Sequence, residues 1–482
     1  MRAHVLLILA ALTACGAPPE LSDGGMGAMD GGTDAGISSP VVLTPLVPSQ
    51  PRRGPVLLRF QVEDPDGQLG ALTLRPTVTG AEYERVGSQL WVVLPSFSLS
   101  TSDGPIALEL VGQTPTGEVT APFTLDLRNA PDVDRVVMTA HRLEPLDGGG
   151  ASSEGIGVSA FTWGASGTVV GAPVRLTVPP GPSLLRAAPH GRATAVMSTS
   201  QVTLLRTPLS GRVADVSVGE TLSLPHGSPA ALEWGADGRY LYVAGGAGPS
   251  GEPPTLWRFE PAEDLSTVGA PSPLVTLPGP PSKLAVDGRR GRLLIYCGSG
   301  GSGLPKLLLY DRTGAERARL EADLGLPEGL AVDPEGEHAL LTSNLFGNEV
   351  RRFRLGDGSL TQEGTVLTTL DTPFEVVFHP APSSALGGPL ALVSTLNRNT
   401  VAPVFLGANG SLSLGTAVSN VPLAAELDVI ARGAQTGTVF VSAVSQLVRL
   451  TVSAQGVGQH HGAAVDFGTG TRNVTQGVAV QR

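Results

Sequence analysis

Two acidic residues occupy matching places in a repeated sequence phrase, and a third lies next to that place in another copy. They are the residues of this chain best suited to chemistry. Glu375 and Glu426 each come immediately before a short apolar run, and Glu328 lies one residue before the matching position of another copy. Lys283 occupies that position in a fourth copy. Carboxylates that converge in a cleft can hold Ca²⁺ or another divalent cation, or act as acid and base in a hydrolysis. The alternative is that they are solvated side chains at strand starts with no chemical role.

The phrase itself predicts the architecture that positions these residues. It begins with a proline, continues through two or three residues into an apolar run, and often turns through an acidic-Gly pair into a second run. Copies begin at Pro229, Pro281, Pro327, Pro373 and Pro422, and an earlier, degraded copy begins at Pro182. A repeat of about 50 residues made of short apolar runs is typical of one four-stranded blade of a β-propeller. The abundant glycine (63 residues) and proline (41 residues) also favour an all-β fold.

The two ends of the repeated region complement each other. Thr475–Val480 matches only the inner-strand part of the phrase, whereas three runs after Asn129 match only the second to fourth strands. These runs are 135–140, 157–163 and 173–178. We therefore expect residues 131–482 to form a seven-bladed propeller in which the C-terminal strand completes the first blade, which removes an open sheet edge.

Aligning the seven copies gives one position at the start of each inner strand. Its residues are Leu184, Ala231, Lys283, Gly329, Glu375, Glu426 and Gly477. Inner strands line the central channel, so we expect this column at one mouth of the channel, where propellers hold ligands.

A separate region precedes the propeller. Residues 41–130 contain short alternating runs separated by turns, which predicts a small Ig-like β-sandwich. Its turn at Asp64–Gly67 resembles turns of bacterial Ig-like modules, some of which bind calcium, but one acidic turn supplies few of the six or more oxygens that Ca²⁺ requires. Residues 16–40 are rich in Gly, Asp and Ser and have no apolar periodicity, which is typical of a flexible tether.

The first 15 residues read as an export signal. Arg2 precedes an apolar core that is too short to span a bilayer. The sequence Leu12-Thr13-Ala14-Cys15 resembles the bacterial lipoprotein box, in which the cysteine receives the lipid. This resemblance implies that Cys15 is lipidated and that the membrane is a partner through the anchor. Gly16 follows the cysteine in place of an inner-membrane retention Asp, which favours the outer membrane within the cell envelope.

Two stretches of the repeat resemble a known family. Leu340–Asn344 with Gly347–Val350, and Leu392–Asn397 with Asn399–Val401, are similar to the YVTN repeats of lactonase-like seven-bladed propellers. The resemblance covers roughly residues 131–482. That family includes lactonases, lyases and proteins without a known reaction, so the resemblance implies the fold and leaves the function open.

Other features exclude functions or indicate structural roles. The net charge of −11 without a cluster of basic residues argues against nucleic acid as a partner. His190 and His379 follow inner strands, where we expect surface residues, and the adjacent pair His460–His461 is poorly placed to chelate a metal. Cys297 lies in an apolar strand and is expected to be a buried, unreactive side chain.

The residues favour one function and leave two others open. The leading hypothesis is a lipid-anchored envelope protein whose propeller binds or scaffolds a protein or small-molecule ligand on its face, and it is not an enzyme. The alternative is a metal-assisted lactonase or related hydrolase that uses Glu328, Glu375 and Glu426 at the channel mouth. The third is a purely structural envelope lipoprotein.

Overall fold

The protein is described by a computed structural model. It describes residues 39–46, 51–100, 102–145, 156–262, 265–299, 303–345, 348–380, 388–443, 446–466, 471–473 and 477–482. The export signal and lipidation site expected at residues 1–15, and nearly all of the expected tether 16–40, lie outside these residues. Val41–Arg482 form one compact unit that consists almost entirely of β-strands. Across the described ranges, no helix is long and apolar enough to cross a bilayer.

The N-terminal part of this unit is a sandwich of two antiparallel sheets. One sheet has the order β1 (Val42–Leu46), β2 (Pro55–Glu63), β5 (Gln89–Pro95), β4 (Glu82–Val86). The other has the order β3 (Leu72–Arg75), β6 (Asp103–Thr114), β7 (Gly117–Arg128), and the four-residue helix α1 (Ser96–Leu99) follows β5. Alternate residues of both sheets, including Phe60 and Phe123, share one core, with ring centroids 5.4 Å apart. The two-sheet sandwich is therefore present, while its Ig-like class stays a prediction.

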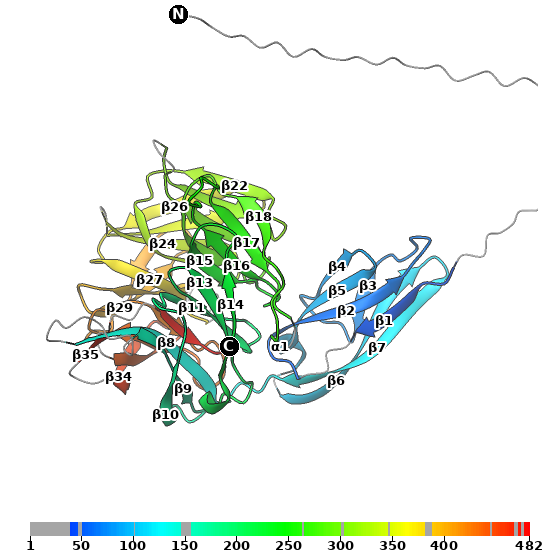
Figure 1. The fold of residues 1–482 in the computed structure, drawn as a ribbon, viewed down its shortest axis with the longest axis horizontal. Coiled ribbons are helices and arrows are strands. Elements are labelled where there is room, and N and C mark those ends of the chain that lie inside the picture. The colour runs from blue at the N-terminus through cyan, green and yellow to red at the C-terminus, as the bar shows by residue number, and fades with distance from the viewer. Residues whose placement is uncertain are drawn as a thin grey trace, which may run out of the picture. The chain divides into compact units, whose positions relative to one another are not determined.

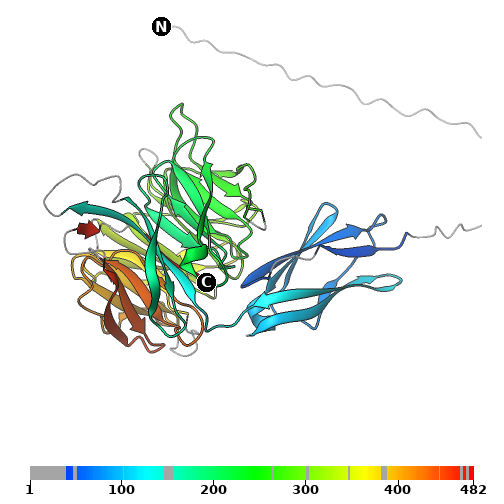
Figure 2. The same ribbon diagram turned by 60° about the horizontal axis from the view of Figure 1, so that its bottom comes forward.

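Seven sheets follow in chain order and form the blades of a propeller (Figures 1 and 2). This confirms the expected all-β propeller fold. Blade one contains β8 (Arg135–Pro145), β9 (Ile156–Trp163) and β10 (Val169–Leu176), with β35 (Thr471–Asn473) and β36 (Gly477–Val480) both paired to β8. Blade two contains β11 (Leu184–Ala187), β12 (Ala193–Met197), β13 (Gln201–Arg206) and β14 (Ser217–Ser223), with the 3-10 turn η2 (Val213–Asp215) before β14. Blade three contains β15 (Pro229–Trp234), β16 (Leu241–Gly245), β17 (Thr255–Phe259) and β18 (Ser272–Thr276).

The remaining four blades have the same order of strands. Blade four contains β19 (Pro281–Val286), β20 (Leu293–Cys297), β21 (Lys306–Tyr310) and β22 (Glu316–Glu321). Blade five contains β23 (Leu326–Val332), β24 (His338–Leu345), β25 (Glu349–Leu355) and β26 (Leu360–Leu367). Blade six contains β27 (Pro373–Phe378), β28 (Leu390–Thr395), β29 (Thr400–Leu406) and β30 (Leu412–Leu414). Blade seven contains β31 (Leu427–Val429), β32 (Thr438–Ala443), β33 (Gln446–Val452) and β34 (Gly458–Asp466).

The inner strands form a closed ring. Contacts between them run from β36 through β11, β15, β19, β23, β27 and β31, and from β31 back to β36. In blade one, β36 pairs antiparallel with β8, so that Val478 lies opposite Thr139 and Ala479 opposite Met138. A late segment of the chain thus supplies the inner strand of the first blade.

Polar side chains fix this closing strand. The side-chain amide of Gln481 donates to the carbonyl oxygens of Gly191 (2.6 Å) and Pro208 (2.7 Å), and its oxygen accepts the backbone N–H of Val136 (3.0 Å). Asp428 of β31 accepts the backbone N–H of Val480 at 2.8 Å. Because these groups are buried, each hydrogen bond satisfies an atom that would otherwise be stranded away from water.

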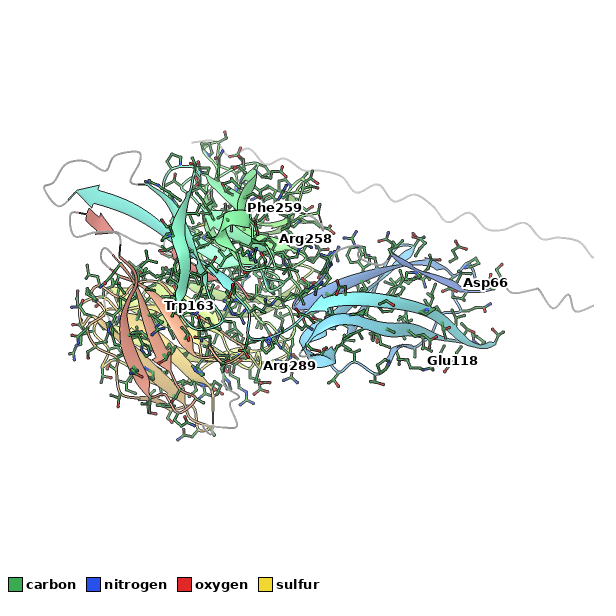
Figure 3. All side chains as sticks on the ribbon, turned by 90° about the horizontal axis from the view of Figure 1, so that it is seen from below. Asp66, Glu118, Trp163, Arg258, Phe259 and Arg289 are labelled. Atoms are coloured by element: carbon green, nitrogen blue, oxygen red, sulfur yellow. The ribbon has the colours of Figure 1, made fainter. Side chains whose placement is uncertain are left out.

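The second strands of the blades explain the continuous apolar runs in the sequence. Strands β12, β16, β20, β28 and β32 are buried at every position. A strand covered on both faces by neighbouring sheets needs apolar residues at successive positions, whereas outer strands such as β10 keep exposed positions. Side chains fill the space between blades, as at Trp163, whose ring meets Phe440 of blade seven edge-on at 5.0 Å (Figure 3).

Candidate functional site

The residues predicted at the channel mouth converge in the structure. Glu375 lies on β27, Lys283 on β19 and Glu328 on β23, while Glu426 comes immediately before β31. The charge of Lys283 acts on all three carboxyl groups and favours their ionised forms, and Glu328 in turn acts on Glu426. Four blades therefore contribute to one cluster of charged side chains.

Arg186 occupies the centre of this cluster. Its guanidinium lies 3.0 Å from a carboxylate oxygen of Glu233, 3.8 Å from Glu375 and 4.0 Å from Glu426. It belongs to β11, whose neighbours in the ring are β36 and β15, whereas the two latter glutamates come from blades six and seven. The arginine side chain thus reaches across the channel and ties distant blades together.

Arg186 and Glu233 occupy a second set of equivalent positions, two residues further along the inner strands than the aligned column. The column alone therefore does not reveal them. Arg186 lies two residues after Leu184, and Glu233 lies two residues after Ala231. Side chains two apart on a strand point to the same side, so each column residue has a neighbour of the same orientation one step deeper. Asp428 stands in the same relation to Glu426, and it lies 2.8 Å from the guanidinium of Arg482.

Close packing of β23 and β27, the inner strands of blades five and six, positions Glu375. A Cβ atom at Gly329 would lie 2.7 Å from the carbonyl oxygen of Phe374 and 2.8 Å from the nitrogen of Val376. The hydroxyl of Thr342 donates to the carbonyl of Phe374, and the backbone N–H of Glu375 donates to the hydroxyl of Ser394 at 3.0 Å. The backbone on both sides of Glu375 is therefore held by neighbouring strands.

Burial disfavours the simultaneous ionisation of the two central carboxyl groups, those of Glu375 and Glu426. The side chains of Glu375 and Glu426 are only 5% and 8% exposed. Burial, reinforced by the charge of Glu426, raises the pKa of Glu375 to about 8, against the opposing effect of Arg186 and Lys283. Burial also raises the pKa of Glu426, and a hydrogen bond joins the two carboxyl groups. Such a bond requires a proton, and a pKa of about 8 keeps that proton on Glu375 at neutral pH.

Arg186 stays charged, and both Arg186 and Glu233 are partly exposed to solvent. Burial opposes the charged form of Arg186, but Glu233, Glu375 and Glu426 outweigh it and raise its pKa. The side chains of Arg186 and Glu233 are 22% and 23% exposed, so solvent reaches the cluster from their side.

Two buried oxygen atoms at the site have an unused capacity to accept hydrogen bonds. Oε2 of Glu426 and Oδ1 of Asn344 have no hydrogen-bond partner among the described residues. Asn344 donates its amide hydrogen to Glu328, whose pKa is raised by burial. Unfilled acceptors in a buried polar site favour a ligand that brings hydroxyl or amine donors.

The donor set does not fit the divalent-cation site that the sequence suggested. A guanidinium already lies among the glutamates, and a second cation, Lys283, acts on the same carboxyls. No group of three or more His, Cys, Asp or Glu side chains suited to a metal occurs in the described ranges. We therefore derive no chemical step through a metal ion.

The acidic turn of the sandwich is also engaged in its own hydrogen bonds. Asp64 accepts the backbone N–H groups of Gln68 (2.6 Å) and Leu69 (3.3 Å) and an N–H of Arg85 (3.0 Å). These donors occupy oxygens that a calcium ion would need. The interpretation of Asp64–Gly67 as a turn is therefore favoured over a calcium site.

The histidine prediction was partly wrong. His379 is not a surface residue: it is 3% exposed, and its Nε2 lies 2.9 Å from the carbonyl oxygen of Val452 in the next blade. His190 packs edge-on against Trp234 at 5.8 Å, and burial lowers its pKa to about 3. Neighbouring blades cover both turns, which a sequence position after a strand does not reveal. Neither histidine contributes to the cluster around Arg186.

The buried thiol was predicted correctly. Cys297 is fully buried, and burial raises its pKa to about 12, which removes thiolate character at neutral pH.

Comparison with known proteins places the propeller among lactonase-like folds. No family model and no curated protein sequence matches the chain. Among solved structures, a protein from Lactobacillus plantarum superposes with a TM-score of 0.54 at 15% identity, covering 73% of this chain and 100% of that one. The periplasmic gluconolactonase of Pseudomonas aeruginosa gives 0.51 at 19% identity, covering 71% and 99%. A proposed 6-phosphogluconolactonase of Bacteroides fragilis gives 0.51 at 15% identity, covering 73% and 99%.

The chain has a β-propeller of the same fold as these three proteins. At these identities the likeness establishes the fold alone, and the chemistry has to be argued from the residues around Arg186.

Proposed function

We propose that the propeller hydrolyses lactones at the mouth of its channel, without a metal ion. The observation that carries the proposal is the hydrogen-bonded carboxyl pair Glu375–Glu426 beside the guanidinium of Arg186. A pair that holds one proton offers a general base and a general acid at the same place. The lactonase-like fold adds support, because solved propellers of similar fold include a gluconolactonase.

The reaction follows from the roles of these groups. The ionised carboxylate of the pair takes a proton from a water molecule, and the water oxygen attacks the lactone carbonyl carbon. Negative charge develops on the carbonyl oxygen, where Arg186 or Lys283 stabilises it. The protonated carboxyl then gives its proton to the ring oxygen as the carbon–oxygen bond breaks. The product is a hydroxy acid, and the pair again holds one proton.

The site favours an uncharged, hydroxylated lactone. Carboxyl groups outnumber the cations Arg186 and Lys283 in the cluster, so a further anionic group on the substrate would meet repulsion. The unfilled acceptors on Glu426 and Asn344 suit substrate hydroxyl groups.

The test is turnover of D-glucono-1,5-lactone by the full chain, followed as acid release at constant pH and corrected for spontaneous hydrolysis. We expect Glu375→Gln and Glu426→Gln each to lower kcat about 100-fold or more, since each removes a proton-transfer group. Glu316→Gln, on the outer strand β22, is the matched control and should leave kcat unchanged. If the wild-type protein opens no lactone faster than buffer, the proposal fails.

A binding or scaffolding module, the function that the sequence favoured, remains the second candidate. Its support is that Arg186 ion-pairs with glutamates of blades three, six and seven, which is an arrangement that can brace the ring without any reaction. In that case substitutions at Glu375 would change stability while no lactone is turned over. The two measurements on the same variants separate the candidates.

We also propose that Cys15 carries a lipid that anchors the protein to the cell envelope, at the outer membrane. The support is the sequence Leu12-Thr13-Ala14-Cys15 after a short apolar core. Mass spectrometry of the N-terminal peptide from membranes should find a diacylglycerol-modified cysteine, and Cys15→Ser should release the protein from the membrane fraction. An unmodified cysteine in membrane-purified protein would contradict the anchor.

A further inference from the structure

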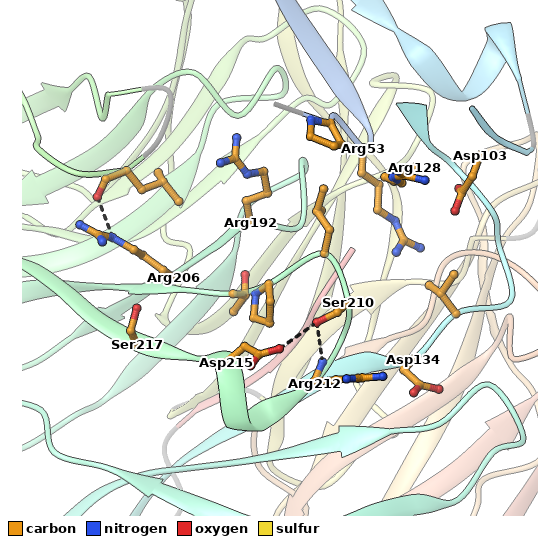
Figure 4. Close-up of a pocket in the computed structure, with 16 residues that line it drawn as sticks. Arg53, Asp103, Arg128, Asp134, Arg192, Arg206, Ser210, Arg212, Asp215 and Ser217 are labelled. Atoms are coloured by element: carbon orange, nitrogen blue, oxygen red, sulfur yellow. Dashed lines mark hydrogen bonds between the residues drawn. The ribbon is translucent and has the colours of Figure 1, made fainter. Parts of the chain in front are cut away.

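A cleft of about 840 Å³ lies where the sandwich meets blade two, away from the channel cluster (Figure 4). Five arginines from separate segments line it: Arg53, Arg128, Arg192, Arg206 and Arg212. Ion pairs such as Arg59–Glu260 (3.1 Å) join the sandwich to the propeller elsewhere in the same compact unit.

Three aspartates also line the cleft, but their oxygens are used locally. Asp103 accepts the backbone N–H of Ala130 at 2.9 Å, and Asp134 accepts that of Ala165 at 3.0 Å. Asp215 accepts the hydroxyl of Ser210 at 3.3 Å. Within the described ranges, no ion pair joins any of them to Arg53, Arg206 or Arg212, although the charge of Asp103 acts on Arg53. Five arginines against three aspartates leave the lining with an excess of positive charge.

Arg53 is a buried cation whose hydrogen-bond donors are incompletely used. It is 1% exposed, its Nε has no hydrogen-bond partner among the described residues, and its Nη2 makes a long contact of 3.5 Å to the carbonyl of Ala130. Figure 4 shows its guanidinium extending into the cleft between Ser210 and Arg128. A buried guanidinium whose donors are incompletely used loses hydration without replacing it.

The surroundings of Arg53 add to the positive potential. Arg206 donates its Nε hydrogen to the carbonyl of Leu265 at 3.0 Å, and no acid among the residues that the structure describes forms an ion pair with it. Burial lowers the pKa of Arg135 to about 9, and the like charges of Arg53 and Arg432 add to this effect.

We propose that this cleft binds a phosphate-bearing anion, with Arg53 and Arg206 as its principal ligands. The planar fork of a guanidinium matches the spacing of phosphate oxygens, and two forks from different elements can hold one phosphate in a fixed orientation. Either a small phosphorylated molecule or a phospholipid headgroup presents this chemistry.

The test is calorimetric titration of the full chain with inorganic phosphate and with pyrophosphate at low ionic strength. We expect saturable binding with a Kd below about 1 mM that weakens as salt rises, because the contacts are electrostatic. In a second arm, vesicles of phosphatidylcholine with phosphatidylglycerol, or without it, compete against phosphate for Cys15→Ser protein, which removes the proposed anchor. Competition by anionic vesicles identifies a headgroup as the source, and competition by pyrophosphate alone identifies a small molecule.

Variants decide whether the cleft is the site. Arg53→Gln should weaken phosphate binding roughly tenfold or more, and Arg206→Gln, at a less buried position that tolerates substitution, should weaken it severalfold. Arg398→Gln, on an exposed turn of blade six with its side chain 66% exposed, is the control and should bind as the wild type does. Absence of saturable binding, or binding that both cleft substitutions leave intact, overturns the proposal. Lactone turnover is a separate measurement, so this site and the channel site can fail independently.

Discussion

Arg186 is the residue on which the electrostatics of the channel depends. It lies within 4.0 Å of three glutamates that are themselves held in place by inner strands. Removing one cation from such a cluster leaves several carboxylates facing one another in a partly buried site, where repulsion is weakly screened.

We expect Arg186→Leu to lower the free energy of unfolding by about 3 kcal/mol at pH 8, since the glutamates lose their common partner. The loss should be smaller at pH 5, because protonation of the same carboxyls removes their mutual repulsion. Urea unfolding at the two pH values measures this difference. Arg186→Lys is the control and should recover part of the stability, whereas equal destabilisation at both pH values would contradict the role given to Arg186.

The raised pKa of Glu375 predicts a second dependence of stability on pH. Its pKa in the folded protein is about 8, above the value of about 4.3 for an unperturbed glutamate. Between these two values the Glu375 carboxyl binds more protons in the folded state than in the unfolded state. Its contribution to the free energy of unfolding is therefore greatest below about pH 4.3 and is lost as pH rises toward 8. The slope from one such group is at most about 1.4 kcal/mol per pH unit.

Glu375→Gln should remove this contribution, because an amide keeps the shape without the charge. The difference in urea midpoint between variant and wild type should then grow in favour of the variant from pH 5 to pH 8. The same comparison with Glu316→Gln, at an exposed position of β22, serves as the control. A flat difference for Glu375→Gln would show that this carboxyl is ionised throughout.

The sequence located the carboxylates of the channel and Lys283 but missed Arg186, the cation that lies closest to them. Matching positions before each inner strand brought Glu375 and Glu426 together with Lys283, because repeated blades place equivalent residues around one axis. Arg186 is deeper by two residues and has no equivalent charge at most other blades, so a single aligned position could not reveal it. The depth of burial, and with it the direction of the pKa shifts, depends on neighbours from across the ring that no local pattern records.

At the scale of elements, the close approach of β23 and β27 depends on a glycine. Gly329 lies against the backbone of β27, and a Cβ there would come within 2.8 Å of three atoms. Gly288 lies in the turn after β19, and a Cβ there would meet no other atom within 4 Å. The two positions provide a matched pair for testing the packing of the ring.

We expect Gly329→Ala to destabilise the protein by about 1–3 kcal/mol, since the added methyl must displace backbone of blade six. Gly288→Ala should change the midpoint of thermal unfolding by little. If Gly329→Ala also lowers lactone turnover while Gly288→Ala does not, the displacement has reached Glu375, which lies next to the affected backbone. Equal stability of both variants would mean that β23 and β27 are not in close contact.

At the scale of the whole molecule, the fold was the part most readily predicted. A period of about 50 residues and the incomplete phrases at its two ends indicated seven blades, because an unfinished blade leaves an open sheet edge. The sandwich was predicted from its short alternating runs, whereas the arginine-lined cleft was not, because its residues come from five separate segments with no common motif.

The closed ring makes the last described strand as stable as the interior. Val478, Ala479 and Val480 are at most 2% exposed and pair with β8. We therefore expect their backbone amides to exchange with deuterium about as slowly as those of β12, and not at the rate of a fraying end. Hydrogen exchange followed by mass spectrometry tests this, with the exposed outer strand β10 as the fast-exchanging reference.

The pairing of β36 with β8 also has a consequence for biogenesis. Residues Val137–Ala140 emerge early from the ribosome, yet their partners Gly477–Val480 are made only after the other six blades. Blade one cannot be completed until then, and contacts so distant along the chain form slowly. If such a chain is exported, its first sheet cannot be completed before the chain crosses the membrane. The chain would then remain unfolded enough to be translocated, and it would depend on chaperones that bind unfolded chains until β36 has been made.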